Sequence, residues 1–142
     1  MPDLELAAVR RLAEAARVAR LATVDADGQP HLVPVCFVLA ADRVHIAVDQ
    51  KPKRRTELRR TANLRATGRA CLLIDHYDED WSQLWWVRLD GSGRVVDDPA
   101  EAIPALAALA EKYPQYRQQP PPGPVLAIEI ERYRGWSAAA LG

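Results

Sequence analysis

The segment 18–49, VARLATVDADGQPHLVPVCFVLAADRVHIAVD, is the feature that most limits what this chain can fold into. Apolar runs at 18–24, 31–39 and 43–49 are separated by turn signals at Asp27-Gly28 and Ala41-Asp42. In the third run, apolar and polar or small residues alternate with the period of two that is typical of a strand with one buried face. The segment therefore predicts an antiparallel meander, in which Pro34 marks an edge strand or a bulge because proline cannot donate a ladder hydrogen bond.

The remaining patterns add helices and further strands around this meander. Helices are expected at 3–17 with Asp3 as cap, at 56–65, and at 98–112, where Asp98 caps, Pro99 is the first helical residue and Pro104 should kink or shorten the helix. Strands are expected at 69–74, at 81–96 with a bend or break at Gly91 and Gly93, and at 125–136. The fold class is therefore mainly β, a small antiparallel barrel with peripheral helices, in one domain spanning residues 1–142 with its barrel at about 18–136.

In the last predicted strand, two sets of side chains should face opposite ways. Leu126, Ile128 and Ile130 are expected on one face, and Ala127, Glu129, Glu131 and Tyr133 on the other. The tryptophans of the 81–96 strand divide in the same manner: Trp85 should face the barrel core, and Trp86 should face a partner subunit or a bound ring.

Positive charge is concentrated in one stretch of a chain whose 19 basic and 19 acidic residues cancel. Between residues 51 and 69 the sequence carries eight cations and one anion, Glu57. A nucleic-acid surface would need interleaved aromatic residues, and this stretch contains none. The overall neutrality likewise gives no field toward nucleic acid or membrane, so the patch predicts a local anion site.

The position of the patch suggests which of its cations bind. Lys53, Arg54, Arg55 and Thr56 lie where a predicted strand gives way to a helix, so free backbone amides can join the cations in facing a phosphate. Arg59, Arg60 and Arg65 follow inside the helix and are interpreted as a solvated face.

Familiar catalytic motifs are absent from the sequence. It has no HExxH, no Cys-x-x-Cys, no GxSxG elbow, no Walker loop and no GxGxxG. No metal site is therefore expected, and such a chain can be an enzyme if a bound anionic cofactor performs the chemistry while the protein supplies binding and orientation. Cys36 and Cys71 stand singly in apolar runs, which favours reduced, buried thiols. The N-terminal stretch lacks an apolar signal-peptide core, so a cytoplasmic location is expected.

The ordered series LATVDADGQPHLVPV, PKRRTELRR and DWSQLWWVRLDG resembles the pyridoxamine-phosphate-oxidase-like, flavin-binding split barrels. Within that family it is most similar to the short actinobacterial group of deazaflavin (coenzyme F420)-dependent enzymes, over about residues 10 to 136. The resemblance implies a homodimer with two cofactor sites at the subunit interface. It also implies a phosphate grip by Lys53, Arg54, Arg55 and Thr56. Relatives commonly have arginine then lysine where this chain has Lys53 and Arg55, so the grip differs in detail.

The resemblance also assigns a place to the cofactor ring. Pro34, Val35, Cys36 and Phe37 match the second-strand stretch beside the ring, while Trp81 and Ser82 match a segment near the site or the dimer contact. The excess of cations over one phosphate favours the deazaflavin, which also carries a polyglutamate tail. The implied function is hydride transfer between F420 and a small unsaturated organic substrate, with Tyr133, His31 or solvent as proton donor. The alternatives are an FMN-dependent oxidase or reductase, and a non-catalytic flavin or haem carrier.

Overall fold

The computed structural model describes residues 3–48 and 57–139. Its elements in chain order are α1 (Leu6–Ala15), β1 (Ala19–Val24), β2 (Pro30–Val35), β3 (Val38–Ala40), β4 (Arg43–Ala47), α2 (Arg59–Ala66), β5 (Arg69–His76), the 3-10 turn η1 (Trp81–Gln83), β6 (Trp85–Val96), α3 (Pro99–Lys112), α4 (Pro114–Gln118) and β7 (Val125–Ser137).

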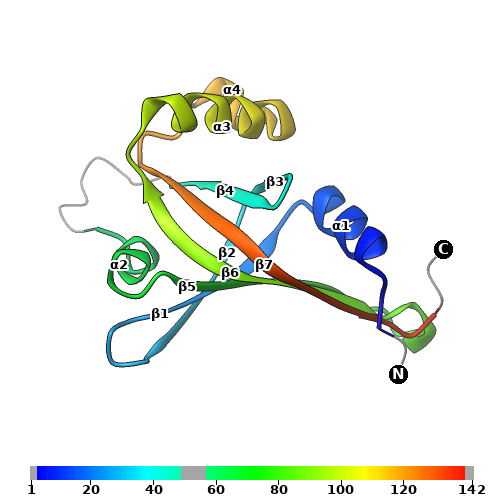
Figure 1. Ribbon diagram of the computed structural model, residues 1–142. Helices are drawn as coiled ribbons and strands as arrows, with labels where there is room; N and C mark the ends of the chain where they lie inside the picture. The colour runs from blue at the N-terminus through cyan, green and yellow to red at the C-terminus, as the bar shows by residue number, and fades with distance from the viewer. Residues whose placement is uncertain (1–2, 49–56, 140–142) are drawn as a thin grey trace.

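The seven strands form one antiparallel sheet in the order β2-β1-β5-β6-β7-β4-β3. The two edge strands, β2 and β3, follow one another in the chain and are separated only by Cys36 and Phe37. The sheet must therefore curl until its edges approach, which gives a split barrel (Figure 1). The mainly β, antiparallel fold class is confirmed. The single strand expected at 31–39 is wrong, because the chain bends at Cys36 and Phe37 to pass from one edge to the other.

The concave side of the curled sheet is a packed core. It takes apolar side chains from all seven strands together with Val9 and Ala13 of α1 and Leu64 of α2. Phe37 is fully buried, so the residue at the bend belongs to this core. Burial of these side chains is the main source of stability for a chain of this size.

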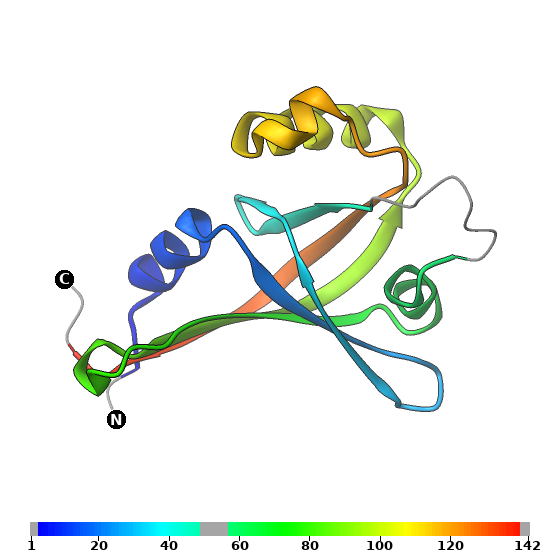
Figure 2. The same ribbon diagram turned by 180° about the vertical axis from the view of Figure 1, so that it is seen from behind.

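Helices cover the openings and one outer side of the barrel. In both views α1 and α2 lie toward opposite ends of the curled sheet, and α3 and α4 lie over β4 (Figure 2). No helix within residues 3–48 and 57–139 is long and apolar enough to cross a membrane.

The two N-terminal helices differ from their predicted bounds. In α1 the N-cap is Glu5, without a side-chain hydrogen bond, while Asp3 instead forms a β-bridge with Trp136. α2 begins at Arg59 rather than at residue 56, and its N-cap is Leu58. Its buried side includes Asn63, whose side-chain amide donates to the Thr23 hydroxyl at 3.0 Å.

The predicted start and end of α3 are confirmed. The Asp98 carboxylate accepts from the Ala100 amide at 2.9 Å, Pro99 is the first helical residue, and the helix ends at Lys112. Pro104, the sixth residue of the helix, does not end it, since α3 continues to Lys112; the proline removes only the amide that would otherwise donate to the Ala100 carbonyl. The short α4 helix that follows was not expected from the sequence.

A bulge in β7 changes which residues face the core. The pairing of β6 with β7 shifts between Asp90 and Gly91, so that Glu131 is an extra residue. One extra residue reverses the alternation, and Tyr133 therefore pairs with the buried Leu89 and packs against the core. The expectation that Tyr133 shares a face with Glu129 is wrong for this reason.

Glu101 joins α3 to the sheet through a small ion network. Its carboxylate accepts from Arg94 at 3.0 and 3.1 Å and lies 2.8 Å from His45 Nε2. These hydrogen bonds, with that of Arg94 largest, lower the pKa of Glu101 from 4.5 to about 2. A carboxylate whose pKa is depressed on folding stabilises the folded state above its unfolded pKa.

We therefore expect Glu101→Gln to lower the free energy of unfolding at pH 7 by about 1 kcal/mol, the size of a partly exposed network. The stabilisation by the ionised Glu101 carboxylate is lost as the pH falls from 4.5 to 2. The variant should therefore lose less stability than the parent protein across that interval. Urea unfolding at several pH values measures both effects. The control is Glu14→Gln, whose partner Arg10 is 3.6 Å away on an exposed helix. Equal stability of Glu101→Gln and the parent at pH 7 would contradict the assignment.

Candidate functional site

The convex face of the sheet carries two parallel rows of outward side chains. In one row, Leu32, Ala22, Cys71, Asp90 and Arg132 are successive cross-strand partners on β2, β1, β5, β6 and β7. In the next, the partners are Pro34, Arg20, Leu73, Arg88 and Arg134. Directly opposed residues share a face of a sheet, so each row is continuous across these strands.

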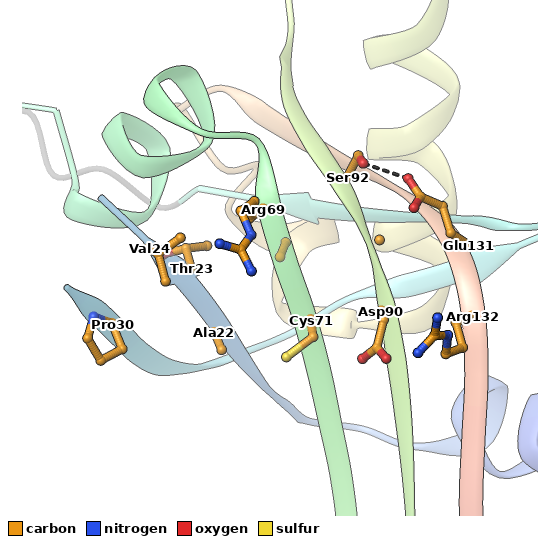
Figure 3. Close-up of a pocket in the computed structure, with 12 residues that line it drawn as sticks. Ala22, Thr23, Val24, Pro30, Arg69, Cys71, Asp90, Ser92, Glu131 and Arg132 are labelled. Carbon is orange, nitrogen blue, oxygen red and sulfur yellow. Dashed lines mark hydrogen bonds between the residues drawn. The ribbon is translucent and has the colours of Figure 1, made fainter. Parts of the chain in front are cut away.

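A pocket of about 510 Å³ lies over the first row, close to the end of α2 (Figure 3). Its lining comes from four neighbouring strands and the start of β2: Ala22, Thr23, Val24, Pro30, Arg69, Ala70, Cys71, Asp90, Gly91, Ser92, Glu131 and Arg132. The centre of this lining is small and apolar, whereas charged groups come from β5, β6 and β7 (Figure 3). These charged groups are Arg69 and Arg132 together with Asp90 and Glu131. The surface therefore suits a flat apolar ligand whose negative charge meets the two arginines at the edge.

The cations around this pocket fall into paired and unpaired groups. Arg88 forms a two-pronged ion pair with Asp90, at 2.8 and 3.2 Å. For Arg20, Arg69, Arg132 and Arg134, no carboxylate of residues 3–48 or 57–139 lies within ion-pair distance. Exposed guanidinium groups without a protein partner remain available to a ligand anion.

The polar groups of the pocket are poorly suited to nucleophilic chemistry. Burial, with a smaller effect of Asp90, raises the pKa of the Cys71 thiol, so the thiol stays protonated at neutral pH. The Ser92 hydroxyl donates to Glu131 at 2.6 Å (Figure 3). The described residues also include no cluster of three groups able to hold a metal ion. The arrangement can bind and orient a ligand, and the ligand must supply the reactivity.

The predicted ring-side stretch is divided by the structure. Pro34 is exposed in a shallow hollow with Val18, Arg20, Leu32 and Val33, on the same convex face as the pocket. Val35 and Phe37 are buried in the core, and Cys36 is half-buried. Of these four, only Pro34 therefore presents its side chain on the convex face.

The bend that follows Pro34 is held by the end of α3. The Tyr113 hydroxyl lies 3.1 Å from the Phe37 amide, from which it accepts, and 3.0 Å from the carbonyl oxygens of Arg17 and Phe37. Tyr113 is itself buried, so its hydroxyl satisfies backbone amide and carbonyl groups at the bend that have no ladder partner in the sheet. The geometry of the ring-side stretch thus depends on α3.

The other predicted site residues lie elsewhere. Trp81 is 68% exposed at the tip between β5 and β6, where Asp80 caps η1 by accepting from the Ser82 amide at 3.1 Å and the Ser82 hydroxyl at 2.8 Å. Lys53, Arg54, Arg55 and Thr56 lie outside the described residues. Trp85 packs against the core and stacks on His76, whereas Trp86 faces the opposite way beneath Arg88, as expected.

Neither predicted proton donor lines the pocket. Tyr133 donates to Asp42 at 2.7 Å, and burial raises its pKa to about 12, so it is a structural link between β7 and the β3–β4 turn. His31 lies on β2 with its Nδ1 atom buried and unpartnered among the described residues.

Sequence reasoning missed the cations of the convex face. Arg132 and Arg134 are two residues apart in β7, and Arg20 and Arg88 stand between buried neighbours, so their alternation could have identified an arginine-rich outer face. The prediction of an anion site used only the dense cluster of cations at 51–69.

Comparison with known proteins identifies relatives of this fold. The family model of pyridoxamine 5'-phosphate oxidase matches residues 6–137. A conserved hypothetical protein of Mycobacterium tuberculosis is similar in structure, with a TM-score of 0.76, 21% identity and coverage of 98% of this chain and 92% of that one. A FAD-binding protein of Mesorhizobium loti has a TM-score of 0.73 and 20% identity, and the match covers 94% of this chain and 95% of that one. The haem storage protein HutZ of Vibrio cholerae has a TM-score of 0.72 and 14% identity, and the match covers 93% of each chain. No curated protein matches the sequence.

The pocket depends on the bulge, and the bulge depends on a glycine. A Cβ atom at Gly91 would lie 2.0 Å from the Glu129 carbonyl oxygen, a backbone atom that cannot move aside cheaply. We expect Gly91→Ala to destabilise the fold by about 1–3 kcal/mol, as overpacking does. Gly28→Asn is the matched control, because nothing lies within 4 Å there and asparagine tolerates its φ of 83°. Urea unfolding compares the two, and an unchanged midpoint for Gly91→Ala would show that the bulge has been misassigned.

Proposed function

Because the chain belongs to the pyridoxamine 5'-phosphate oxidase family of flavin-binding split barrels, we propose that it is an oxidoreductase using coenzyme F420. The deazaflavin, when bound, supplies the hydride that is exchanged with a small unsaturated organic substrate. The observation that supports this proposal best is the pocket on the convex face of the sheet. It combines an apolar floor with arginines that have no ion-pair partner within residues 3–48 and 57–139, and its Cys71 thiol stays protonated at neutral pH.

The residues of the pocket fit a deazaflavin. A volume of about 510 Å³ is within the range of cofactor sites. Ala22 and Cys71 form an apolar floor against which a flat ring can lie, and Arg132 at the rim can pair with a carboxylate or phosphate. The ring would thereby be held and oriented without any covalent bond to the protein.

The phosphate grip and the ring-side contacts remain those expected from the sequence. Lys53, Arg54, Arg55 and Thr56 precede α2, whose far end runs into Arg69 at the pocket. In this proposal they hold the cofactor phosphate, and Pro34 contacts the ring from β2 while Val35, Cys36 and Phe37 fix the position of that strand. The cations of β6 and β7 are then available to the polyglutamate tail.

A second copy of the chain would complete each site. Three apolar residues of the convex face lie close to the arginines of both rows and are partly exposed: Leu32 is 66% exposed, Val18 41% and Leu73 36%. Apolar side chains interleaved with arginine are typical of subunit interfaces. A two-fold dimer across this face would cover both pockets, and Trp81 and Ser82 of one protomer would contact the other.

Two other functions use the same pocket. An FMN-dependent oxidase or reductase needs only a site for the phosphate and a site for the ring. A flavin or haem carrier needs a binding site but no catalytic groups. The carrier is favoured by one observation of this structure, namely that the Cys71 thiol has a raised pKa and the Ser92 hydroxyl already donates to Glu131.

Titration of the purified protein with oxidised F420 and with FMN, followed by ring fluorescence, separates these functions. We expect micromolar binding of F420 that is tighter than that of FMN. Lys53→Ala combined with Arg55→Ala, and Arg132→Ala separately, should each weaken F420 binding several-fold, and the difference should shrink with added salt. Arg11→Ala, on the outside of α1, is the control.

Each other outcome points to one alternative. Tighter binding of FMN would exclude the deazaflavin as the cofactor. Binding of F420 without hydride transfer to a panel of enones and quinones would identify a carrier. Unchanged affinity in Arg132→Ala would place the ligand outside the convex-face pocket.

The dimer is tested by charge placed on the proposed interface. Leu32→Glu should convert the dimer into monomers in sedimentation experiments, because an unpaired carboxylate would be buried at the contact. Ile103→Glu on α3 is a matched control, since Ile103 is also 66% exposed. A parent protein that sediments as a monomer, or a Leu32→Glu variant that stays dimeric, would contradict the proposed interface.

A further inference from the structure

A second groove lies between α3 and the outer side of β3 and β4. It has a volume of about 440 Å³, which is within the range of small-molecule sites. Its lining comes from β3, from the outward side chains of β4 and from α3 with its Asp98 cap, and it shares no residue with the pocket over Ala22 and Cys71. The groove is therefore a separate place at which a ligand can bind.

Both sides of the groove carry small apolar residues. From β3 come Val38 and Ala40, which pair with the lining residues of β4 and therefore face the same way as they do. From α3 come Ala100, Pro104 and Ala108, whose spacing of four residues places them along one side of the helix. These short side chains leave between helix and strands a channel that suits an aliphatic group.

The end of the groove at the start of α3 is charged. Glu101 lies there with both oxygens occupied, since they accept from Arg94 and one lies 2.8 Å from His45 Nε2. Arg43 donates through its Nε atom to Glu129, and its Nη1 atom lies 3.7 Å from Glu101. Its Nη2 atom has no hydrogen-bond or ion-pair partner in the described part of the chain, and 42% of the side chain is exposed. Arg43 therefore keeps N–H groups that can donate to a ligand anion.

Asp98 supplies the opposite charge at the same end of the groove. Its Oδ1 atom accepts from the Ala100 amide at 2.9 Å as the helix cap. Among residues 3–48 and 57–139, no group donates to its second oxygen and no cation lies within 4.0 Å of its carboxylate. Arg43 and Asp98 are thus two lining residues of opposite charge that do not pair with each other. A ligand can bind between them through one positive and one negative group.

We propose that this groove binds a free α-amino acid with an aliphatic side chain. The α-carboxylate accepts from Arg43 Nη2, the α-ammonium group donates to Asp98, and the side chain lies between β3 and the Pro104–Ala108 side of α3. A ligand with only one of the two charges would cover the groove and leave the other protein group without a partner, which costs binding free energy. The inference goes beyond the proposed oxidoreductase function and does not depend on which cofactor the convex face binds.

Equilibrium dialysis of the intact protein against radiolabelled L-leucine tests the proposal. We expect a dissociation constant of about 1 mM or lower. Isocaproate lacks the ammonium group of leucine and isoamylamine lacks its carboxylate, so each should compete at least about tenfold more weakly than unlabelled leucine. The proposal is overturned if leucine does not bind at concentrations up to about 10 mM, or if either analogue competes as well as leucine does.

Two variants locate the bound leucine. Asp98→Asn keeps a good helix N-cap and removes the charge, so it should weaken leucine binding about tenfold. Ala108→Leu fills the apolar end of the groove and should abolish binding. Ala107→Leu is the matched control, because Ala107 is exposed on α3 outside the groove, and it should bind leucine as the parent does. Urea midpoints show that each variant is folded, and unchanged affinity in Asp98→Asn or Ala108→Leu would overturn the proposal.

Discussion

The bend at Cys36 and Phe37 is the constraint on which the rest of this structure depends. The two strands that it joins lie at opposite edges of the sheet, so the sheet can only be a curled one. At the bend the backbone leaves the ladder, and the buried Tyr113 hydroxyl takes up its polar groups. The end of α3 is therefore as much a part of the barrel as the strands are, and Glu101 holds the other end of that helix.

Curling gives the sheet two faces with different uses. The concave face is filled by apolar side chains, whereas the pocket of about 510 Å³ lies on the convex face. The bulge at Glu131 lets β7 place Tyr133 inside and Arg132 outside, beside Asp90 and Cys71. Gly91 allows the close backbone approach that the bulge requires. The pocket is thus a consequence of strand geometry, and its charge is a consequence of which residues the bulge turns outward.

The sequence predicts those parts of this fold that follow from local patterns. The β1–β2 hairpin, the Asp98 cap and the alternation in β4 and β7 up to Ile130 depend on neighbouring residues, and the structure confirms them. The three-strand meander expected at 18–49 is wrong, because β2 lies at one edge of the sheet and β3 and β4 lie at the other. The bend at Phe37 and the reversal at Tyr133 were missed because both result from pairing between distant strands. The convex-face site was missed for the same reason, since its residues come from separate strands and share no motif. The predicted phosphate residues, Lys53 to Thr56, lie outside the described residues and stay a prediction.

We propose that the convex face, rather than the barrel interior, holds a deazaflavin. A crystal structure of the protein with F420 tests this proposal most directly. We expect the ring to lie over Ala22 and Cys71, with Arg132 at its edge and the phosphate at Lys53 to Thr56. A ring bound inside the barrel or in the groove beside His45 and Glu101, or a site that accepts FMN and leaves F420 in solution, would contradict it.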